Sequence, residues 1–159
     1  MADERKMMRA REVYRTMCEC LDKLDWKYDK VEGELQILSG AGSEDMPISF
    51  RIDVDAERSL ISLLSGLDIE IPEDLRIDMS LVVSVANNNM VHGSFDYDVS
   101  SGNLLFRMVC PYHESLIGGD VFEYMVYVAC RTVDDYNHKF AAFASGEMSF
   151  EEFLKGDEE

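Results

Sequence analysis

Three histidines are the residues of this 159-residue chain best suited to metal binding or acid–base chemistry. His92, His113 and His138 are scattered, and none stands in His-x-x-x-His or His-Glu-x-x-His spacing. A helical zinc site needs such spacing, because residues one turn apart share a face of the helix. The glycine-containing segment 39–45, a predicted loop, also lacks the Gly-Lys-Ser/Thr ending of a phosphate-binding loop. We therefore expect no metal site and no cofactor.

A nucleophile paired with a base is the other chemistry that the residue types allow. The chain has no Gly-x-Ser-x-Gly motif. Cys110 lies in an apolar run, which is typical of a structural thiol, and His113 follows Pro111 and Tyr112 in a predicted loop. A small hydrolase or transferase that uses His113 with a nearby carboxylate or with Cys110 is the alternative interpretation. The leading prediction is a protein without catalytic residues.

Two groups of carboxylates could in principle hold a cation. Asp53, Asp55 and Glu57 alternate at the end of a predicted strand, where carboxylates are usually only solvated. The later sequence Asp-Tyr-Asp-Val-Ser begins like a calcium-binding loop. Ser101 and Arg107, however, stand where that loop requires a glycine and a bidentate glutamate. Neither group predicts a calcium site.

The four cysteines, Cys18, Cys20, Cys110 and Cys130, lack the paired spacing of a zinc site. Cys18 and Cys20 would point to different sides of a helix, and we expect at least Cys110 and Cys130 to be buried. We expect a cytoplasmic protein, in which these thiols stay reduced. The chain opens with charged residues, and no apolar run approaches the ~20 residues that span a bilayer, so no membrane association is expected.

The formal net charge of -17 argues against nucleic acid and anionic membranes as partners, because both are bound mainly through Lys and Arg. A weaker interpretation is an acidic mimic of nucleic acid. The charge is uneven: residues 1–30 hold 8 basic and 7 acidic residues, and the rest of the chain holds 7 basic and 25 acidic residues. The basic side chains of the first segment could dock it on an acidic body or partner, or could simply be solvated.

Hydrophobic periodicity predicts helices and strands along the chain. The predicted helices cover residues 4–24, 72–90 and 119–145, and a capping box at 149–152 opens a short final one. The predicted strands cover residues 26–31, 35–39, 48–54, 95–99 and 104–109. Residues 58–65 fit either a strand or a helix, and we favour a strand. Asp120 is the predicted N-cap of the long helix, and Asn87, Asn88 and Asn89 are predicted to cap the end of the second helix.

These elements predict an α+β fold in which an antiparallel sheet of five to six strands is flanked by helices. Their order is α-β-β-β-(β)-α-β-β-α. The length favours a single domain over residues 1–159. Within it, residues 1–24 carry the N-terminal amphipathic helix, and residues 156–159 form an acidic tail.

The second helix carries apolar residues on two sides. Its first face, which suits the core, consists of Leu75, Met79, Val82, Ala86 and Met90. Ile77, Leu81 and Val85 form a stripe on nearly the opposite side. A surface helix has no reason to be apolar on two sides, so we predict that this stripe pairs with its copy in a homodimer. The alternative is cover by the N-terminal helix, which would leave a monomer.

The chain resembles the YbjN family, whose fold is similar to that of class I type III secretion chaperones of the CesT or Tir-chaperone type. The resemblance extends over about residues 20–145. The residues that carry it are Trp26, the alternating strand 48–54, Ile71-Pro72-Glu73-Asp74-Leu75-Arg76, Asn88-Asn89, Gly93-Ser94-Phe95-Asp96-Tyr97-Asp98 and Gly102-Asn103-Leu104-Leu105-Phe106-Arg107.

The resemblance implies a small acidic protein, often dimeric, that binds segments of other proteins or regulates without chemistry. The YbjN family is itself described as regulators of bacterial sensory transduction. We therefore expect a non-enzymatic, chaperone-like module in which sheet and dimer surfaces recognise protein or peptide segments through apolar pockets rimmed by carboxylates.

Overall fold

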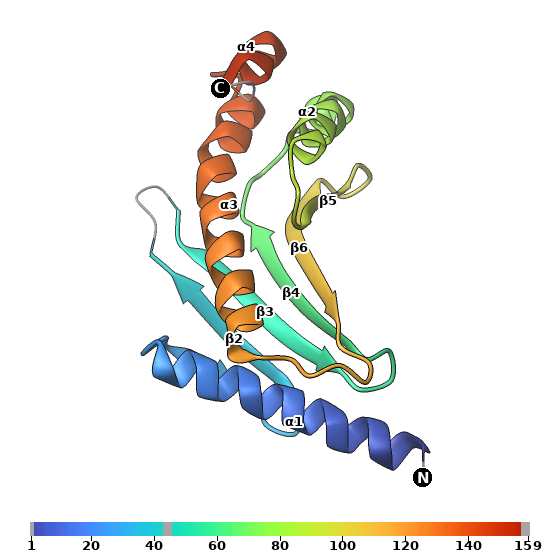
Figure 1. The fold of residues 1–159 in the computed structure, drawn as a ribbon. Helices are drawn as coiled ribbons and strands as arrows, with labels where there is room; N and C mark the ends of the chain where they lie inside the picture. Colours follow the sequence, from blue (N-terminus) through green and yellow to red (C-terminus); the bar gives the residue numbers. More distant parts are fainter. Residues whose placement is uncertain (1, 43–45, 157–159) are drawn as a thin grey trace.

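The computed structural model describes residues 2–42 and 46–156, and Figure 1 shows their arrangement. The helices are α1 (Ala2–Lys23), the 3₁₀ turn η1 (Glu73–Leu75), α2 (Arg76–Asn88), α3 (Gly119–Ser145) and α4 (Phe150–Gly156). The strands are β1 (Tyr28–Lys30), β2 (Gln36–Ala41), β3 (Ile48–Asp55), β4 (Leu60–Leu67), β5 (Ser94–Asp98) and β6 (Asn103–Pro111). The element order is the one expected from the sequence, and the segment that fitted either a strand or a helix forms β4.

All six strands belong to one antiparallel sheet, in the order β1-β2-β3-β4-β6-β5. The register places Ile52 of β3 between Ile37 of β2 and Leu63 of β4, and all three side chains are fully buried. The period of two in β3 identified its inner face correctly, because its alternate residues are all buried: Ile48, Phe50, Ile52 and Val54.

The helices lie on one face of this sheet. Figure 1 shows α3 in orange along the sheet, α1 in blue at one end, and α2 and α4 in green and red at the other end. Helix α3 packs on β3, β4 and β6 and buries Phe122, Met125, Ala129, Val133 and Phe140. Thr132 and Tyr136, which have the same helical spacing, are only half-buried.

Helix α1 does not cover the outer stripe of α2, so the alternative arrangement predicted from the sequence is wrong. Its own apolar stripe packs against α3 and β3, and Ala10, Met17 and Leu21 are fully buried there. Helix α2 contacts β5, α3 and α4 at the opposite end of the sheet. The order of elements along the sequence could not distinguish these two places, because both ends of the sheet offer apolar surface.

Two predicted helix starts need correction. Gly118, with an extended backbone (φ -80°, ψ 163°), is the N-cap of α3, and Asp120 lies inside the first turn, where a carboxylate still suits the positive end of the helix dipole. The second helix opens with the 3₁₀ turn η1, so α2 itself begins at Arg76 rather than at residue 72. Residues 43–45 of the predicted loop and 157–159 of the acidic tail lie outside the described residues.

The capping box at the start of α4 forms as predicted. The Ser149 N–H donates to the Glu152 carboxylate at 2.8 Å, and the Glu152 N–H donates to the Ser149 hydroxyl at 3.2 Å. These two bonds satisfy donors that the helix itself leaves open. Phe153 of α4 is buried and stacks on Phe140 of α3, with ring centroids 5.9 Å apart. Helix α4 is thereby held against the end of α3.

Candidate functional site

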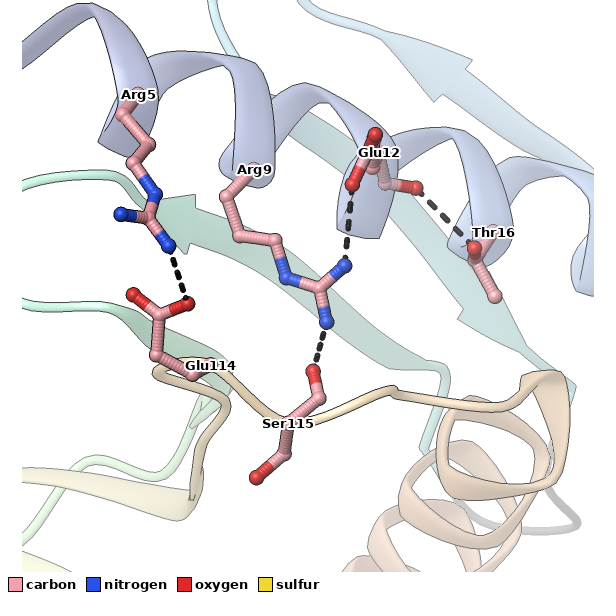
Figure 2. A network of polar contacts seen from close by, with 6 residues as sticks. All are labelled: Arg5, Arg9, Glu12, Thr16, Glu114 and Ser115. Atoms are coloured by element: carbon pink, nitrogen blue, oxygen red, sulfur yellow. Dashed lines mark hydrogen bonds and ion pairs between the residues drawn. The ribbon is translucent and has the colours of Figure 1, made fainter.

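His113 lines a pocket of about 510 Å³ together with Glu12 and Glu114, the carboxylates that a catalytic histidine would need. Both carboxylates are paired with arginines: Arg5 donates to Glu114 at 3.0 Å, and Arg9 donates to Glu12 at 3.0 Å (Figure 2). Within the described residues His113 makes no hydrogen bond or ion pair with a carboxylate or a thiol. The structure therefore does not bring together the acid–base pair of the enzyme interpretation.

Cys110 does not join His113 either. It lies on the inner face of β6 opposite Ile61, and the contact of its thiol is the carbonyl oxygen of its neighbour Pro111, at 3.8 Å. Burial raises the pKa of this thiol, which disfavours the thiolate form that a nucleophile needs.

The prediction of which cysteines are buried was wrong. Cys18 and Cys20 are the buried pair, with 6% and 8% exposure, whereas Cys110 and Cys130 are half-buried, and all four are free. The reason is that the start of α3 approaches α1 closely. A Cβ at Gly119 would lie 3.3 Å from the Cys20 Cβ, and the Cys20 thiol donates to the Gly119 carbonyl oxygen at 3.0 Å. Helix α1 is therefore covered over a wider arc than its apolar stripe indicates.

Two of the three carboxylates considered as cation ligands at the end of β3, Asp53 and Asp55, are occupied by neighbouring donors. Asp53 accepts bonds from Gln36 and from Arg51, the latter at 3.2 Å, and Asp55 accepts the Arg58 N–H at 2.8 Å. Across residues 2–42 and 46–156, no three His, Cys, Asp or Glu side chains are grouped as metal ligands. These carboxylates belong to a hydrogen-bonded polar surface.

The segment that resembled a calcium loop is the turn between β5 and β6. Asp98 accepts bonds from the hydroxyls of Ser100 and Ser101 at 2.6 and 2.7 Å, and from the Ser100 N–H at 2.9 Å. These bonds lower the pKa of the Asp98 carboxyl to about 2. The carboxylate stabilises the turn.

The outer stripe of α2 lies partly in solvent. Ile77 is 70% exposed, Leu81 is 53% exposed and Val85 is half-buried. The inner face predicted from the sequence is correct for Met79, Val82 and Ala86, while Leu75 and Met90 are half-buried. Val83 is also buried, because α2 lies in the angle between β5, α3 and α4.

A groove of about 350 Å³ continues from the stripe of α2 toward α4. Its lining is mostly apolar: Leu75, Asp78, Leu81, Phe143, Gly146, Met148 and Phe150. The sequence did not predict this groove, because it forms only when Gly146, at φ +81°, turns the chain back after α3. The sequence features that could have indicated the groove are the capping box and the phenylalanines of α4.

The outer face of the sheet is the second apolar surface. In the described part of the chain no helix packs on it, because the helices lie on the opposite face. The register aligns Leu38, Arg51, Leu64 and Arg107 across β2, β3, β4 and β6. Leu38 is 46% exposed, as is Val109 of β6 at 47%.

Charged residues surround these apolar positions. Arg51 pairs with Asp53 at 3.2 Å, and Arg107 pairs with Asp96 at 3.0 Å. A shallow pocket of about 380 Å³ opens beside Leu64. Acidic and basic side chains rim it: Glu34, Arg51, Asp53, Asp55 and Arg58. The outer face thus offers apolar contacts between charges of both signs, an arrangement suited to polypeptide rather than to nucleic acid.

In the described residues, every helix is too short or too polar to cross a lipid bilayer. The candidate surfaces of the described residues are the stripe of α2 with its groove, the outer face of the sheet, and the pocket at His113. Three solved structures have a similar fold.

A chain of the HopA1–SchA chaperone–effector complex superposes with a TM-score of 0.59 at 9% identity, over 82% of this chain and 97% of that chain. A chain of the ExsC–ExsE complex superposes with a TM-score of 0.52 at 12% identity, over 81% of this chain and 93% of that chain. YbjN from E. coli, described as a candidate transcription regulator, superposes with a TM-score of 0.56 at 12% identity, over 79% of this chain and 92% of that chain.

No protein-family model and no curated protein sequence matches the chain. Similarity at identities of 9% to 12% shows a shared fold but does not show a shared function. The architecture implied by the resemblance is confirmed: the chain has the type III secretion chaperone-like α+β fold, which it shares with YbjN.

Proposed function

We propose that this protein is a non-enzymatic, cytoplasmic binding module that holds an extended segment of another protein on the outer face of its sheet. The observation that carries the proposal is the row of Leu38, Arg51, Leu64 and Arg107, which places apolar and charged contacts alternately on a face without helix cover. An extended segment turns every second side chain toward the surface on which it lies, so its apolar side chains can contact this face together.

Two of the similar structures are complexes between proteins, one of them a chaperone with its effector, and the third is a candidate regulator. These similarities support a binding or regulatory role of YbjN type over a catalytic one. Within the described residues His113 forms no hydrogen bond with Cys110, and its neighbouring carboxylates are paired with arginines, which supports this role further. The net charge of -17 favours a basic partner segment and disfavours an acidic one.

The test uses two short synthetic peptides, one alternating leucine with lysine and one alternating leucine with glutamate. Fluorescence anisotropy should show saturable binding of the lysine peptide and none of the glutamate peptide. The double variant Leu38→Glu/Val109→Glu should weaken binding about tenfold or more, because two carboxylates would be desolvated under an apolar partner.

Leu116→Glu is the matched control, since Leu116 is 91% exposed and lies outside the sheet. It adds one negative charge without touching the outer face and should leave the affinity within about twofold. If net charge alone attracted the lysine peptide, both variants would bind it at least as tightly as wild type, because each adds negative charge. That result, or the absence of saturable binding, would overturn the proposal.

We also propose that the protein is a homodimer through the outer stripe of α2. Ile77 and Leu81 are exposed, Val85 is half-buried, and α1 lies at the other end of the sheet. A two-fold axis beside α2 would cover the stripe on both copies at once, because an isologous interface uses the same patch twice. The adjoining apolar groove beside Leu81 would extend the covered surface.

Sedimentation velocity of wild type and Leu81→Glu tests the dimer. Wild type should sediment as a dimer, and the variant as a folded monomer or a much weaker dimer, because the interface would desolvate a charge. Met8→Glu, at another exposed apolar position, on α1, is the control and should remain dimeric. An 18.1 kDa monomer for wild type at concentrations on the order of tens of micromolar would contradict the proposal.

A further inference from the structure

The pocket of about 510 Å³ at His113 differs in charge from the rest of the molecule. It lies between the first turns of α1, the turn between β3 and β4, and the segment between β6 and α3. Its lining is Arg5, Lys6, Met8, Arg9, Glu12, Ser59, His113 and Glu114. Three side chains are permanently cationic and two are acidic, so its formal charge is positive in a chain of -17. It shares no lining residue with the groove of α2 or the pocket of the outer sheet face.

The cations of this pocket are incompletely neutralised. The Lys6 ammonium donates to the Glu57 carbonyl oxygen at 2.9 Å, and no carboxylate of the described residues forms an ion pair with it. Arg5 pairs with Glu114, but their side chains are 77% and 84% exposed. An ion pair so open to water is weak, and a stronger anion can displace Glu114 from Arg5.

Arg9 supplies a donor that nothing in the described chain accepts. Its terminal nitrogens bond Glu12 and the Ser115 carbonyl oxygen, whereas its Nε is buried without a hydrogen-bond partner. Figure 2 shows Arg5 and Arg9 extending from the same side of α1 toward the segment that carries Glu114 and Ser115. The two guanidinium groups are one helical turn apart, so a single small anion can lie against both.

The backbone around this pocket is held in an unusual conformation. Ser59 has φ +56° and His113 has φ +36°, and with Asp25 they are the non-glycine residues of positive φ in the described chain. Tyr112 connects the two segments, because its N–H donates to the Ser59 carbonyl oxygen at 3.0 Å and its hydroxyl donates to the Asp55 carbonyl oxygen at 2.9 Å. Such conformations persist where the surroundings enforce them, and they concentrate at functional sites.

We infer that this pocket binds a phosphate group. A monocarboxylate would offer Arg5 no more than Glu114 already does, whereas a doubly charged oxyanion can accept from Arg5 and Lys6 together. The net charge of the whole chain opposes anions, so the affinity must come from these short-range bonds. The bound group would connect α1 to both segments of the body and strengthen its docking.

The test is a titration of the full chain with inorganic phosphate, followed by calorimetry and by amide NMR shifts. We expect saturable binding, with the largest shifts at residues 5–9, 57–59 and 113–115. The variant Arg5→Gln/Lys6→Gln should bind phosphate about tenfold more weakly or worse. Arg11→Gln is the matched control, because Arg11 is an exposed arginine of the same helix outside the pocket, and it should bind like wild type.

Acetate and phosphoserine are titrated alongside. Acetate should bind more weakly than phosphate. Phosphoserine binding as tight as phosphate would indicate a phosphorylated side chain as the natural source, and preference for the free ion would indicate inorganic phosphate; both support the pocket. If the double variant no longer gives the NMR spectrum of a folded protein, the single variant Lys6→Gln replaces it in the phosphate titration.

Three results would overturn the inference: no saturable binding by wild type, equal weakening by Arg11→Gln, or largest shifts elsewhere. The Leu38→Glu/Val109→Glu variant should keep its phosphate affinity. The phosphate site and the peptide-binding face are therefore tested independently, and either can fail without the other.

Discussion

The side-chain amide of Asn87, near the end of α2, makes two hydrogen bonds to the backbone of Phe95 in the edge strand β5. Its Nδ2 donates to the Phe95 carbonyl oxygen at 2.9 Å, and its Oδ1 accepts the Phe95 N–H at 2.7 Å. The asparagine was predicted to cap its own helix, and that prediction is wrong. Instead, Asn87 occupies the backbone groups that a neighbouring strand would otherwise bond, which protects this edge of the sheet.

Asn87→Ala should destabilise the protein by about 1–3 kcal/mol, because it leaves a partly buried N–H and carbonyl of Phe95 without partners. Denaturant unfolding measures the loss, and hydrogen exchange at the Phe95 amide should become faster. Asn88→Ala is the control, since Asn88 is exposed and its side chain hydrogen-bonds its neighbour Asn89 rather than β5. Equal unfolding midpoints for the two variants would contradict the role of Asn87.

Phe50→Asp should cost several kcal/mol, whereas Arg51→Ala should change stability by about 0.5 kcal/mol or less. Phe50 is 4% exposed on the inner face of β3, and a buried unpaired carboxylate is costly there. Arg51 lies on the outer face, in a half-exposed pair with Asp53. Denaturant unfolding of both variants measures the two losses of stability. Coincident unfolding curves would mean that the register of β3 is wrong.

The Asp98 carboxyl should titrate near pH 2, below its ordinary value of 3.8. A folded-state pKa below the unfolded one means that its contribution to stability is present above about pH 4 and is lost as the pH falls toward 2. The NMR shift of the Asp98 carboxyl carbon reports this titration. Replacing Ser100 and Ser101 with alanine should raise the pKa, because both hydroxyls donate to the carboxylate. An unchanged titration midpoint of Asp98 in that variant would mean that the two hydroxyls do not lower its pKa.

Thiol labelling of the native protein should be slow at all four cysteines and fast after denaturation. Cys18 and Cys20 are buried, and burial together with the charge of Asp134 raises the pKa of Cys130 to about 11. The thiolate is the reacting form, so few Cys130 side chains react at neutral pH. Mass spectrometry after timed alkylation gives the rate at each site. A disulfide between Cys18 and Cys20, or between Cys110 and Cys130, in cytosolic material would contradict this prediction.

Features that depend on nearby residues could be predicted from the sequence. The alternation from Ile48 to Val54 places its own side chains on two faces because the strand period is two. The capping box from Ser149 to Glu152 closes within a single turn. The inner face of α2 at Met79, Val82 and Ala86 follows from the helical period alone. Such patterns need no knowledge of what lies across the sheet.

The tertiary structure alone decided the surfaces. The row of Leu38, Arg51, Leu64 and Arg107 exists because three consecutive strands pair in one register with β6, which α2 and β5 separate from them in the sequence. The positive pocket exists because Arg5 and Arg9 of α1 meet Glu114 and Ser115 beyond β6. Periodicity describes which side of an element is apolar, but not which element it will meet. The contacts between elements depend on the packing of the whole sheet and its helices, and these contacts determine how exposed each candidate site is.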